Sequence, residues 1–170
     1  DKGDDDLDEN NLVQQTYDTS FTTGRVLSNN TVDYTGTDYG WYFELPDTGE
    51  RSVTRPVVRG SVVFFNTFVP NSDPCSVGGY GYRFAVDLTT GGSPDEVVVD
   101  SDGDGILDDN DKATNSSGGT GVLASTGAIP GYQPESVFGG NIRFTGDETD
   151  VVEELKNIPT GRFSWQELIQ

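Results

Sequence analysis

The sequence predicts an all-β domain, and three features of the chain support this prediction. Runs of β-branched and aromatic residues recur along it, the most apolar of them at residues 61–68. Glycine-containing turn signals separate the runs, as at residues 78–79, 91–92 and 139–140. Segments that could form a helix are few and short. Short strands joined by turns of this kind are typical of antiparallel all-β architectures.

The apolar pattern places each strand in turn. In residues 41–45 alternate side chains share one face of the expected strand, and the apolar ones are Trp41, Phe43 and Leu45. Residues 61–68 form an almost continuous apolar run, which predicts a strand buried on both faces. Strict alternation over residues 80–88, repeated at 142–144, predicts strands with one apolar face. Residues 95–99 are rich in valine and also read as a strand.

Helical signals occur only near the end of the chain. Asp150 followed by Glu153 has the spacing of a capping box, which predicts one or two helical turns over residues 150–156. Ser164 and Glu167 repeat this spacing among the last residues. Both segments are short, so a strand remains an alternative for each of them.

Composition and charge exclude several classes of function. Acidic residues number 29 against 10 basic ones, and the net charge of -19 would repel nucleic acid and anionic membranes while attracting cations. No apolar run reaches the roughly 18 residues that a membrane-spanning helix needs, so no membrane insertion is expected. Histidine is absent, and neither a nucleophile elbow nor a P-loop occurs. Cys75 has no disulfide partner within this sequence, so it is a buried small residue or pairs with a cysteine outside this sequence or in another molecule. We therefore expect a protein that is not an enzyme.

One segment, residues 100–111 (DSDGDGILDDND), has the spacing of a calcium-binding loop and is called the aspartate loop below. In this spacing acidic residues alternate at the start, and Gly105 stands where the chain must bend sharply. The side chain of Ile106 is expected in the core, while its backbone carbonyl faces the ion. The predicted metal ligands are Asp100, Asp102, Asp104, the carbonyl of Ile106, Asp108 and Asp111.

The oxygen-rich ligand set predicts Ca²⁺ as the bound ion. Calcium takes about 6–8 oxygen ligands, whereas zinc prefers the histidine and cysteine that this loop lacks. Magnesium is the second choice, because it demands a tighter octahedral cage. The loop departs from an EF-hand because its last position is Asp111 rather than glutamate, and because no helix is expected to flank it. The same spacing occurs in dockerin and thrombospondin type 3 repeats, but here it occurs once.

Several motifs outside the loop occur together in this sequence. A GWY…LP…GER segment begins at Gly40, and an RPVVRG strand start follows it. A VPxxDPCxxGG turn contains Cys75, and the next strand ends in DxxxGG. The chain closes on GRxSWxxL. In combination these motifs resemble the C-terminal domain of the PilC/PilY family, and the resemblance covers residues 40–168. It divides the chain into an acidic N-terminal arm with leading strands, residues 1–39, and a PilC/PilY-like domain, residues 40–170.

The resemblance implies a fold and a function. It implies an incomplete β-propeller built of antiparallel sheets, because the chain is too short for a closed ring of blades. It implies a calcium-binding, extracellular component of type IV pilus tips that acts in adhesion and pilus assembly. The implied partners are pilins and a host or surface receptor. By matching position, it also assigns Asp100, Asp102, Asp104, the Ile106 carbonyl and Asp108 as ligands, whereas Asp111 is assigned from spacing alone.

A second hypothesis follows from the incompleteness of the ring. An open ring exposes unpaired strand edges, which are templates for pairing with another chain. Copies of this chain could therefore complement each other's sheets head to tail and form an extracellular fibre. In this alternative the partner is a further copy of the same chain.

Overall fold

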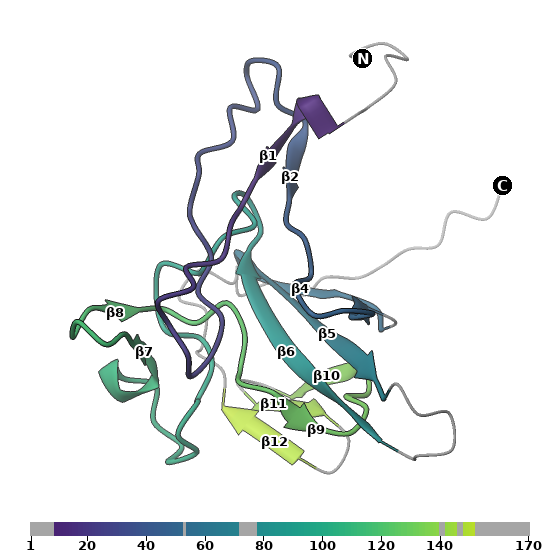
Figure 1. Ribbon diagram of the computed structural model, residues 1–170, viewed down its shortest axis with the longest axis vertical. Helices are drawn as coiled ribbons and strands as arrows, with labels where there is room; N and C mark the ends of the chain where they lie inside the picture. Colours follow the sequence, from purple (N-terminus) through teal and green to yellow (C-terminus); the bar gives the residue numbers. More distant parts are fainter. Residues whose placement is uncertain (1–8, 53, 72–77, 140–141, 146–147, 152–170) are drawn as a thin grey trace, which may run out of the picture.

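The computed structural model describes residues 9–52, 54–71, 78–139, 142–145 and 148–151. Its regular elements in this part of the chain are twelve strands and two short 3₁₀ turns, η1 (Glu9–Asn11) and η2 (Asp109–Asp111) (Figure 1). The prediction of an all-β fold with little helix is confirmed. Within the described residues, no helix is long and apolar enough to cross a membrane. Cys75 lies outside them.

The centre of the molecule is an antiparallel pair of long strands. Strand β5 (Val62–Pro70) pairs with β6 (Gly79–Asp87) over its whole length, from Val62 opposite Asp87 to Pro70 opposite Gly79. Three short strands widen this sheet, and its order is β3-β5-β6-β9 with β4 also on β5. They are β3 (Arg51–Ser52), β4 (Val57–Arg59) and β9 (Ile129–Pro130).

Both faces of the β5–β6 pair are covered, as the continuous apolar run of residues 61–68 predicted. The single apolar face expected from the alternation over residues 80–88 is wrong for β6, because Arg83 and Ala85 on its other face are buried as well. On one face the rings of Phe65 and Phe84 stack with centroids 4.7 Å apart, and Phe43 packs against both. Trp41, Phe43 and Leu45 all contact this cluster, as their predicted common face requires, but the expected strand over residues 41–45 ends at Tyr42. On the opposite face Phe64 packs with Val98 and with other buried side chains.

The N-terminal segment forms a parallel pair, which the expectation of antiparallel sheets did not include. Strand β1 (Leu12–Gln14) lies parallel to β2 (Gly40–Tyr42), and the two rise together from the body of the molecule (Figure 1). The buried side chain of Gln15 holds this segment, because its amide donates to the carbonyls of Asn30 and Thr90. These contacts cross the expected boundary at residue 39, and the two-part division remains a prediction.

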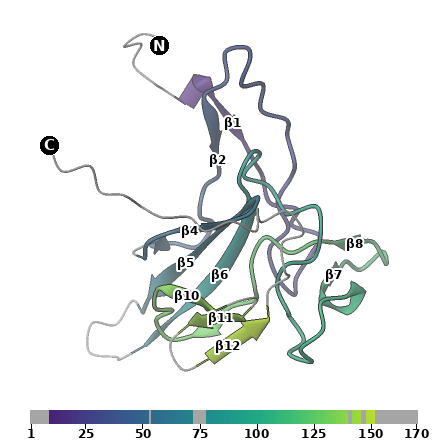
Figure 2. The ribbon, with the colours of Figure 1, turned by 180° about the vertical axis from the view of Figure 1, so that it is seen from behind.

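A third sheet lies beyond the central one. It is antiparallel and consists of β10 (Ser136–Gly139), β11 (Ile142–Thr145) and β12 (Glu148–Val151), and Figure 2 shows it below β5 and β6. The expected helix start at Asp150 is wrong, because Asp150 pairs with Arg143 in the ladder between β11 and β12. The rest of that segment lies outside the described residues. The described sheets close into no ring, and their arrangement as propeller blades remains a prediction.

The expected strand at residues 95–99 is also wrong. Val98 and Val99 are buried, but they belong to no strand ladder. The chain here crosses the face of the central sheet, so that the side chains contact Val62 and Phe64 while the backbone does not pair. Valine in this segment therefore reflects burial rather than strand pairing. The segment leads directly into the aspartate loop.

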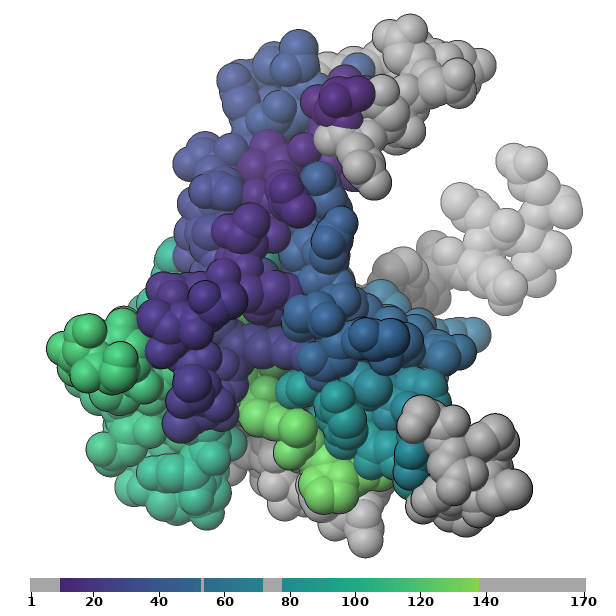
Figure 3. Space-filling model, viewed as in Figure 1, coloured from purple at the N-terminus to yellow at the C-terminus, as the bar shows by residue number. Residues whose placement is uncertain are grey.

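The aspartate loop and the small hairpin that follows it lie on the surface. The hairpin consists of β7 (Ala113–Thr114) and β8 (Thr120–Gly121). Together they form a lobe at the left of the molecule (Figures 1 and 3). Ala113 anchors this lobe, because it packs with Val26 and Leu123 in a third buried cluster.

Candidate metal centre

Three of the predicted ligands lie together. One carboxylate oxygen from each of Asp100, Asp102 and Asp104 falls within 4.8 Å of the other two. Glycines make this convergence sterically accessible, since Gly103 and Gly105 have φ angles of 79° and 83°, in the left-handed region. The alternation of aspartate and glycine in the sequence therefore folds into a tight turn whose carboxylates converge.

Backbone N–H groups of the loop hold these carboxylates in place. The carboxylate of Asp100 accepts from the N–H of Gly103 at 2.6 Å and from that of Gly105 at 2.9 Å. Asp102 accepts from the N–H of Asp104 at 3.1 Å, and Asp104 accepts from that of Ile106 at 2.8 Å. Each aspartate thus turns its side chain back over the residues that follow it.

The electrostatics of the cluster favour a cation. The N–H of Asp104 lowers the pKa of Asp102, but desolvation and the negative charges of Asp104, Asp111 and Asp100 outweigh it. The net result is a pKa of Asp102 above its ordinary value. A raised carboxylate pKa means that the ionised form is disfavoured by its surroundings. A bound cation would relieve this repulsion.

The remaining predicted ligands have other contacts. Asp108 is the N-cap of η2 and accepts from the N–H of Asn110 at 2.7 Å. Asp111 is buried, with 1% of its surface exposed, and accepts from backbone N–H groups at both ends of the loop. Neither belongs to the group of carboxylates that converge.

The expectation that the side chain of Ile106 lies in the core is wrong. This side chain is 60% exposed. Its neighbour Leu107 is half-buried instead and lines a small recess together with Val97. The loop lies on the surface of the domain, and the one apolar side chain that turns inward belongs to the next residue.

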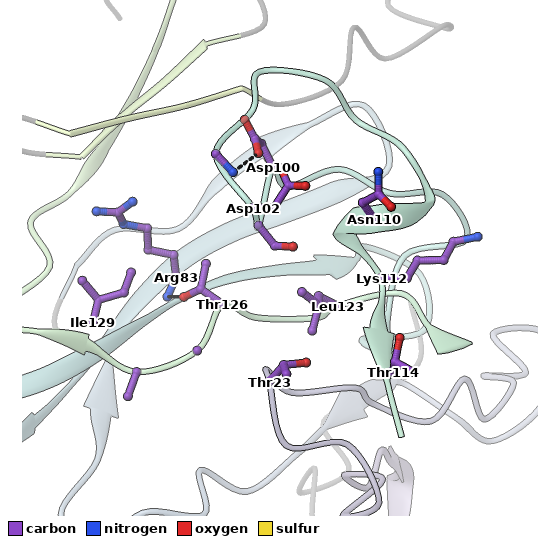
Figure 4. A pocket seen from close by; sticks show the side chains of 14 residues that line it. Thr23, Arg83, Asp100, Asp102, Asn110, Lys112, Thr114, Leu123, Thr126 and Ile129 are labelled. Carbon is purple, nitrogen blue, oxygen red and sulfur yellow. Dashed lines mark hydrogen bonds between the residues drawn. The ribbon is translucent and has the colours of Figure 1, made fainter. Parts of the chain in front are cut away.

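A larger recess, of about 580 Å³, opens beside the loop. Asp100 and Asp102 stand on one side of it, and Thr126 and Leu123 on another (Figure 4). The side chain of Lys112 points away from the centre of the recess (Figure 4). The carboxylates are therefore reached from solvent through an open approach. Sequence reasoning had no signal for this recess, because its lining comes from segments far apart in the chain.

The donor set fits a hard divalent cation. Asp100, Asp102 and Asp104 supply carboxylate oxygens from one turn, and the loop contains no histidine or cysteine. Oxygen ligands of this kind suit Ca²⁺ and Mg²⁺ rather than Zn²⁺. The loop is preceded by the buried valines and followed by β7, and its last residues form η2, so the paired helices of an EF-hand do not flank it.

Sequence reasoning missed a second charged cluster, which lies on the face of the central sheet that carries Phe84. Arg25 forms ion pairs with Glu50 at 2.7 Å and with Asp47 at 3.1 Å. Its guanidinium also lies 3.5 Å from the ring centroid of Tyr82. Burial, followed by the hydrogen bond to Asp47, raises the pKa of Tyr82 to about 12. The Glu50 side chain is fully buried and also accepts from the hydroxyl of Thr67 at 2.6 Å, so the cluster is internally satisfied.

Known proteins that are similar to this chain include type IV pilus biogenesis factors. No family model matches the chain. The chain is 30% identical over 151 residues to a type IV pilus biogenesis factor PilY1 homolog of Xylella fastidiosa, which covers 79% of this chain and 11% of that protein. It is 30% identical over 119 residues to the type IV pilus biogenesis factor PilY1 of Pseudomonas aeruginosa PAO1, covering 60% of this chain and 10% of that protein.

The chain is related to PilY1. The crystal structure of the Pseudomonas aeruginosa PilY1 C-terminal domain superposes on it with a TM-score of 0.67 and 20% identity, over 87% of this chain and 33% of that chain. These comparisons confirm the resemblance to the PilC/PilY C-terminal domain that the motifs predicted. The PilY1-like chain spans only about a tenth of its curated relatives, 11% and 10% of their lengths.

The structure also explains one of the motifs that carried the resemblance. In the GER motif, Glu50 is the buried partner of Arg25, and Arg51 donates to the carbonyl of Gly49 at 3.1 Å. The motif therefore places a carboxylate inside the PilY1-like domain where the N-terminal segment crosses the sheet. The DPC turn and the closing GRxSWxxL motif lie outside the described residues.

Proposed function

We propose that this chain is a Ca²⁺-binding domain of an extracellular type IV pilus biogenesis factor, which acts at the pilus tip in assembly and adhesion. The relationship to proteins named PilY1 supports the assignment to pilus biogenesis. The proposed partners are pilins and a surface receptor, and the proposed location is the cell surface. The absence of histidine and of nucleophile motifs supports a role in binding rather than in catalysis.

One observation carries the proposal of calcium binding: carboxylate oxygens of Asp100, Asp102 and Asp104 converge to within 4.8 Å in a loop that opens to solvent. Together they bring three negative charges into one turn, where desolvation and then the neighbouring carboxylates outweigh the hydrogen bond from the Asp104 N–H and raise the pKa of Asp102. Ca²⁺ would supply the opposite charge and would accept these oxygens as ligands. The carbonyl of Ile106 and the carboxylate of Asp108 are the next candidates, and water would complete the coordination.

Calorimetric titration of the purified chain tests this proposal. We expect one Ca²⁺ per chain in the wild type and little or no binding after Asp104→Ala. The matched control is Asp109→Asn, since Asp109 lies in the same segment but is exposed and pairs with Lys112. Wild-type binding that survives Asp104→Ala, or absence of binding in the wild type, would overturn the proposal.

The pilus role needs a test in cells. We expect that deletion of the gene in its source organism reduces the number of surface pili, and that the wild-type gene restores it. The Asp104→Ala gene should restore pili only in part if the ion supports assembly, whereas the Asp109→Asn gene should restore them fully. An unchanged number of pili and unchanged surface attachment after deletion would contradict the role.

Self-assembly into a fibre is the second candidate, and the sheet edges favour it. Among the described residues, β12 has a strand neighbour only on the side of β11, and β2 has one only on the side of β1. Open edges of this kind can accept a strand from another copy. The net charge of -19 on each copy opposes such contacts, so calcium would have to reduce the repulsion.

Electron microscopy and mass measurement at high protein concentration separate the two candidates. Filaments that form in calcium and dissolve in chelator would support the fibre. Compact particles of monomer mass in both conditions would exclude it and leave the pilus-tip role.

A further inference from the structure

Asp111 differs from the other aspartates of the loop in its burial and its contacts. Only 1% of its surface is exposed, whereas Asp102 and Asp104 are exposed. One of its carboxylate oxygens accepts from the N–H of Ser101 at 2.5 Å and from that of Asp102 at 3.3 Å. The other oxygen accepts from the N–H of Asp108 at 3.1 Å. A single side chain thus joins the beginning of the aspartate loop to its end.

These contacts use most of the accepting capacity of the Asp111 carboxylate. A carboxylate offers about four lone-pair sites, and three of those of Asp111 face backbone N–H groups. The spacing of the sequence made Asp111 the last ligand of the loop, yet its oxygens do not lie with those of Asp100, Asp102 and Asp104. The hydroxyl of Ser101 adds to this closure, because it donates to the backbone carbonyl of Asp111 at 3.2 Å.

The two ends of the loop lead into different parts of the core. Before the loop, Val98 and Val99 pack with Phe64 on the central sheet. After the loop, Ala113 packs with Val26 in a different buried cluster. The hydrogen bonds of Asp111 therefore hold together two segments that are anchored in separate clusters. Their contribution to the fold requires no ion.

We propose that Asp111 is a positioning residue that closes the aspartate loop before any ion arrives, rather than a ligand of the ion. Its role toward Ca²⁺ rests on the proposed function, whereas its role in closing the loop does not. In a closed loop the carboxylates of Asp100, Asp102 and Asp104 already converge, so that the binding of an ion requires little ordering of the chain. Loss of Asp111 would open the loop and weaken both the apo domain and the site.

Thermal unfolding in excess chelator, paired with Ca²⁺ titration, tests this assignment. We expect Asp111→Ala to lower the unfolding temperature in chelator by about 4–8 °C, because buried N–H groups lose their acceptor. We expect the affinity for Ca²⁺ to fall roughly 10- to 100-fold while the stoichiometry stays at one ion per chain. Asp111→Asn should lie between wild type and Asp111→Ala, because an amide oxygen can still accept from Ser101 while its NH₂ group opposes the N–H of Asp108.

A matched control separates positioning from general loss of stability. Val98→Ala removes buried apolar volume from the cluster before the loop and leaves the carboxylates untouched. We expect it to lower the unfolding temperature in chelator without changing the affinity for Ca²⁺. If Asp111→Ala fails to fold, amide hydrogen exchange of the wild type in chelator decides instead. Protected N–H groups at Ser101 and Asp108 support the closure, and rapid exchange at both overturns it.

The outcomes distinguish this inference from the proposed function. An unfolding temperature of Asp111→Ala equal to that of the wild type in chelator, with a loss only in calcium, would make Asp111 a ligand and overturn the inference. If the wild type binds no Ca²⁺, the proposed site fails. The difference in unfolding temperature between the wild type and Asp111→Ala in chelator still decides whether Asp111 closes the loop.

Discussion

The indole ring of Trp41 lies directly against the backbone of Gly91. A Cβ atom on Gly91 would stand 2.1 Å from two atoms of this ring, and the φ angle of Gly91 is 74°. The indole N–H of Trp41 also donates to the carbonyl of Leu88 at 3.0 Å, in the same turn. The GWY motif and the DxxxGG motif, about 50 residues apart in the sequence, therefore form one contact in the folded chain.

The contact predicts a large cost for Gly91→Ala. The new methyl group would clash with the ring of Trp41 and would stand on a backbone in the left-handed region. We expect a loss of more than about 2 kcal/mol in the free energy of unfolding, measured with urea. Gly118→Ala is the control, since Gly118 has a similar φ of 81° but no atom within 4 Å of the added methyl. Equal losses for the two variants would show that the ring contact contributes nothing.

The buried ion pair of Arg25 and Glu50 gives a second prediction. Arg25→Met removes the cation and leaves the fully buried Glu50 side chain with only Thr67 as a hydrogen-bond partner outside its own turn. We expect a loss of about 3–5 kcal/mol in the free energy of unfolding, because an unpaired buried carboxylate is poorly solvated. Urea unfolding measures it.

The control for the ion pair is Lys112→Met. This change breaks the pair of Lys112 with Asp109, whose side chain is 93% exposed, and should leave the free energy of unfolding nearly unchanged, because solvent screens an exposed pair. The double variant Arg25→Met with Glu50→Leu should recover part of the loss, because it removes both buried charges. A double variant less stable than Arg25→Met would show that the unpaired carboxylate of Glu50 does not cause the loss.

Asp87 makes the stability of the turn after β6 depend on pH. Burial raises the pKa of Asp87, but hydrogen bonds from Thr89 and Thr90 outweigh it and hold this pKa below its ordinary value. A depressed pKa in the folded state means that the carboxylate stabilises the fold above the unfolded pKa of about 3.9. That contribution is lost as pH falls through the folded pKa.

Comparison of wild type with Asp87→Asn over pH checks this sign. We expect the wild type to be the more stable protein at neutral pH. The difference in unfolding free energy should shrink below about pH 4 and close in stronger acid. A difference that stays constant with pH would mean that the charge of Asp87 does not matter.

Removal of one loop charge should have opposite effects with and without calcium. In chelator Asp102→Asn relieves the repulsion that raises the pKa of Asp102, so we expect a protein at least as stable as the wild type. In calcium the same variant lacks a ligand and should unfold at a lower temperature than the wild type. Thermal unfolding in both conditions tests this, and equal destabilisation in both would contradict it.

The sequence predicted the central strands well because their side-chain pattern records burial directly. Strands β5 and β6 coincide with the continuous run and the alternating run. The same reasoning failed at residues 95–99, since Val98 and Val99 are buried without strand partners. An apolar pattern reports that a side chain is covered, but it does not report whether the backbone beside it is paired.

The aspartate loop shows a similar limit. The spacing placed Asp100, Asp102 and Asp104 together, because neighbouring residues in a tight turn have few ways to arrange themselves. It did not reveal that Asp111 turns into the protein, nor that Leu107 rather than Ile106 is the half-buried side chain. Those outcomes depend on where the loop leaves and rejoins the core.

The sequence by itself determined the all-β class, the long central strands and the cluster of carboxylates, because each of these rests on residues close together in the chain. Only the tertiary structure decided the parallel pairing of β1 with β2, the burial of Glu50 against Arg25 and the contact of Trp41 with Gly91. These contacts join segments distant in sequence. Local propensity and periodicity set which side chains are buried, whereas the partner of each is chosen by how the whole chain packs.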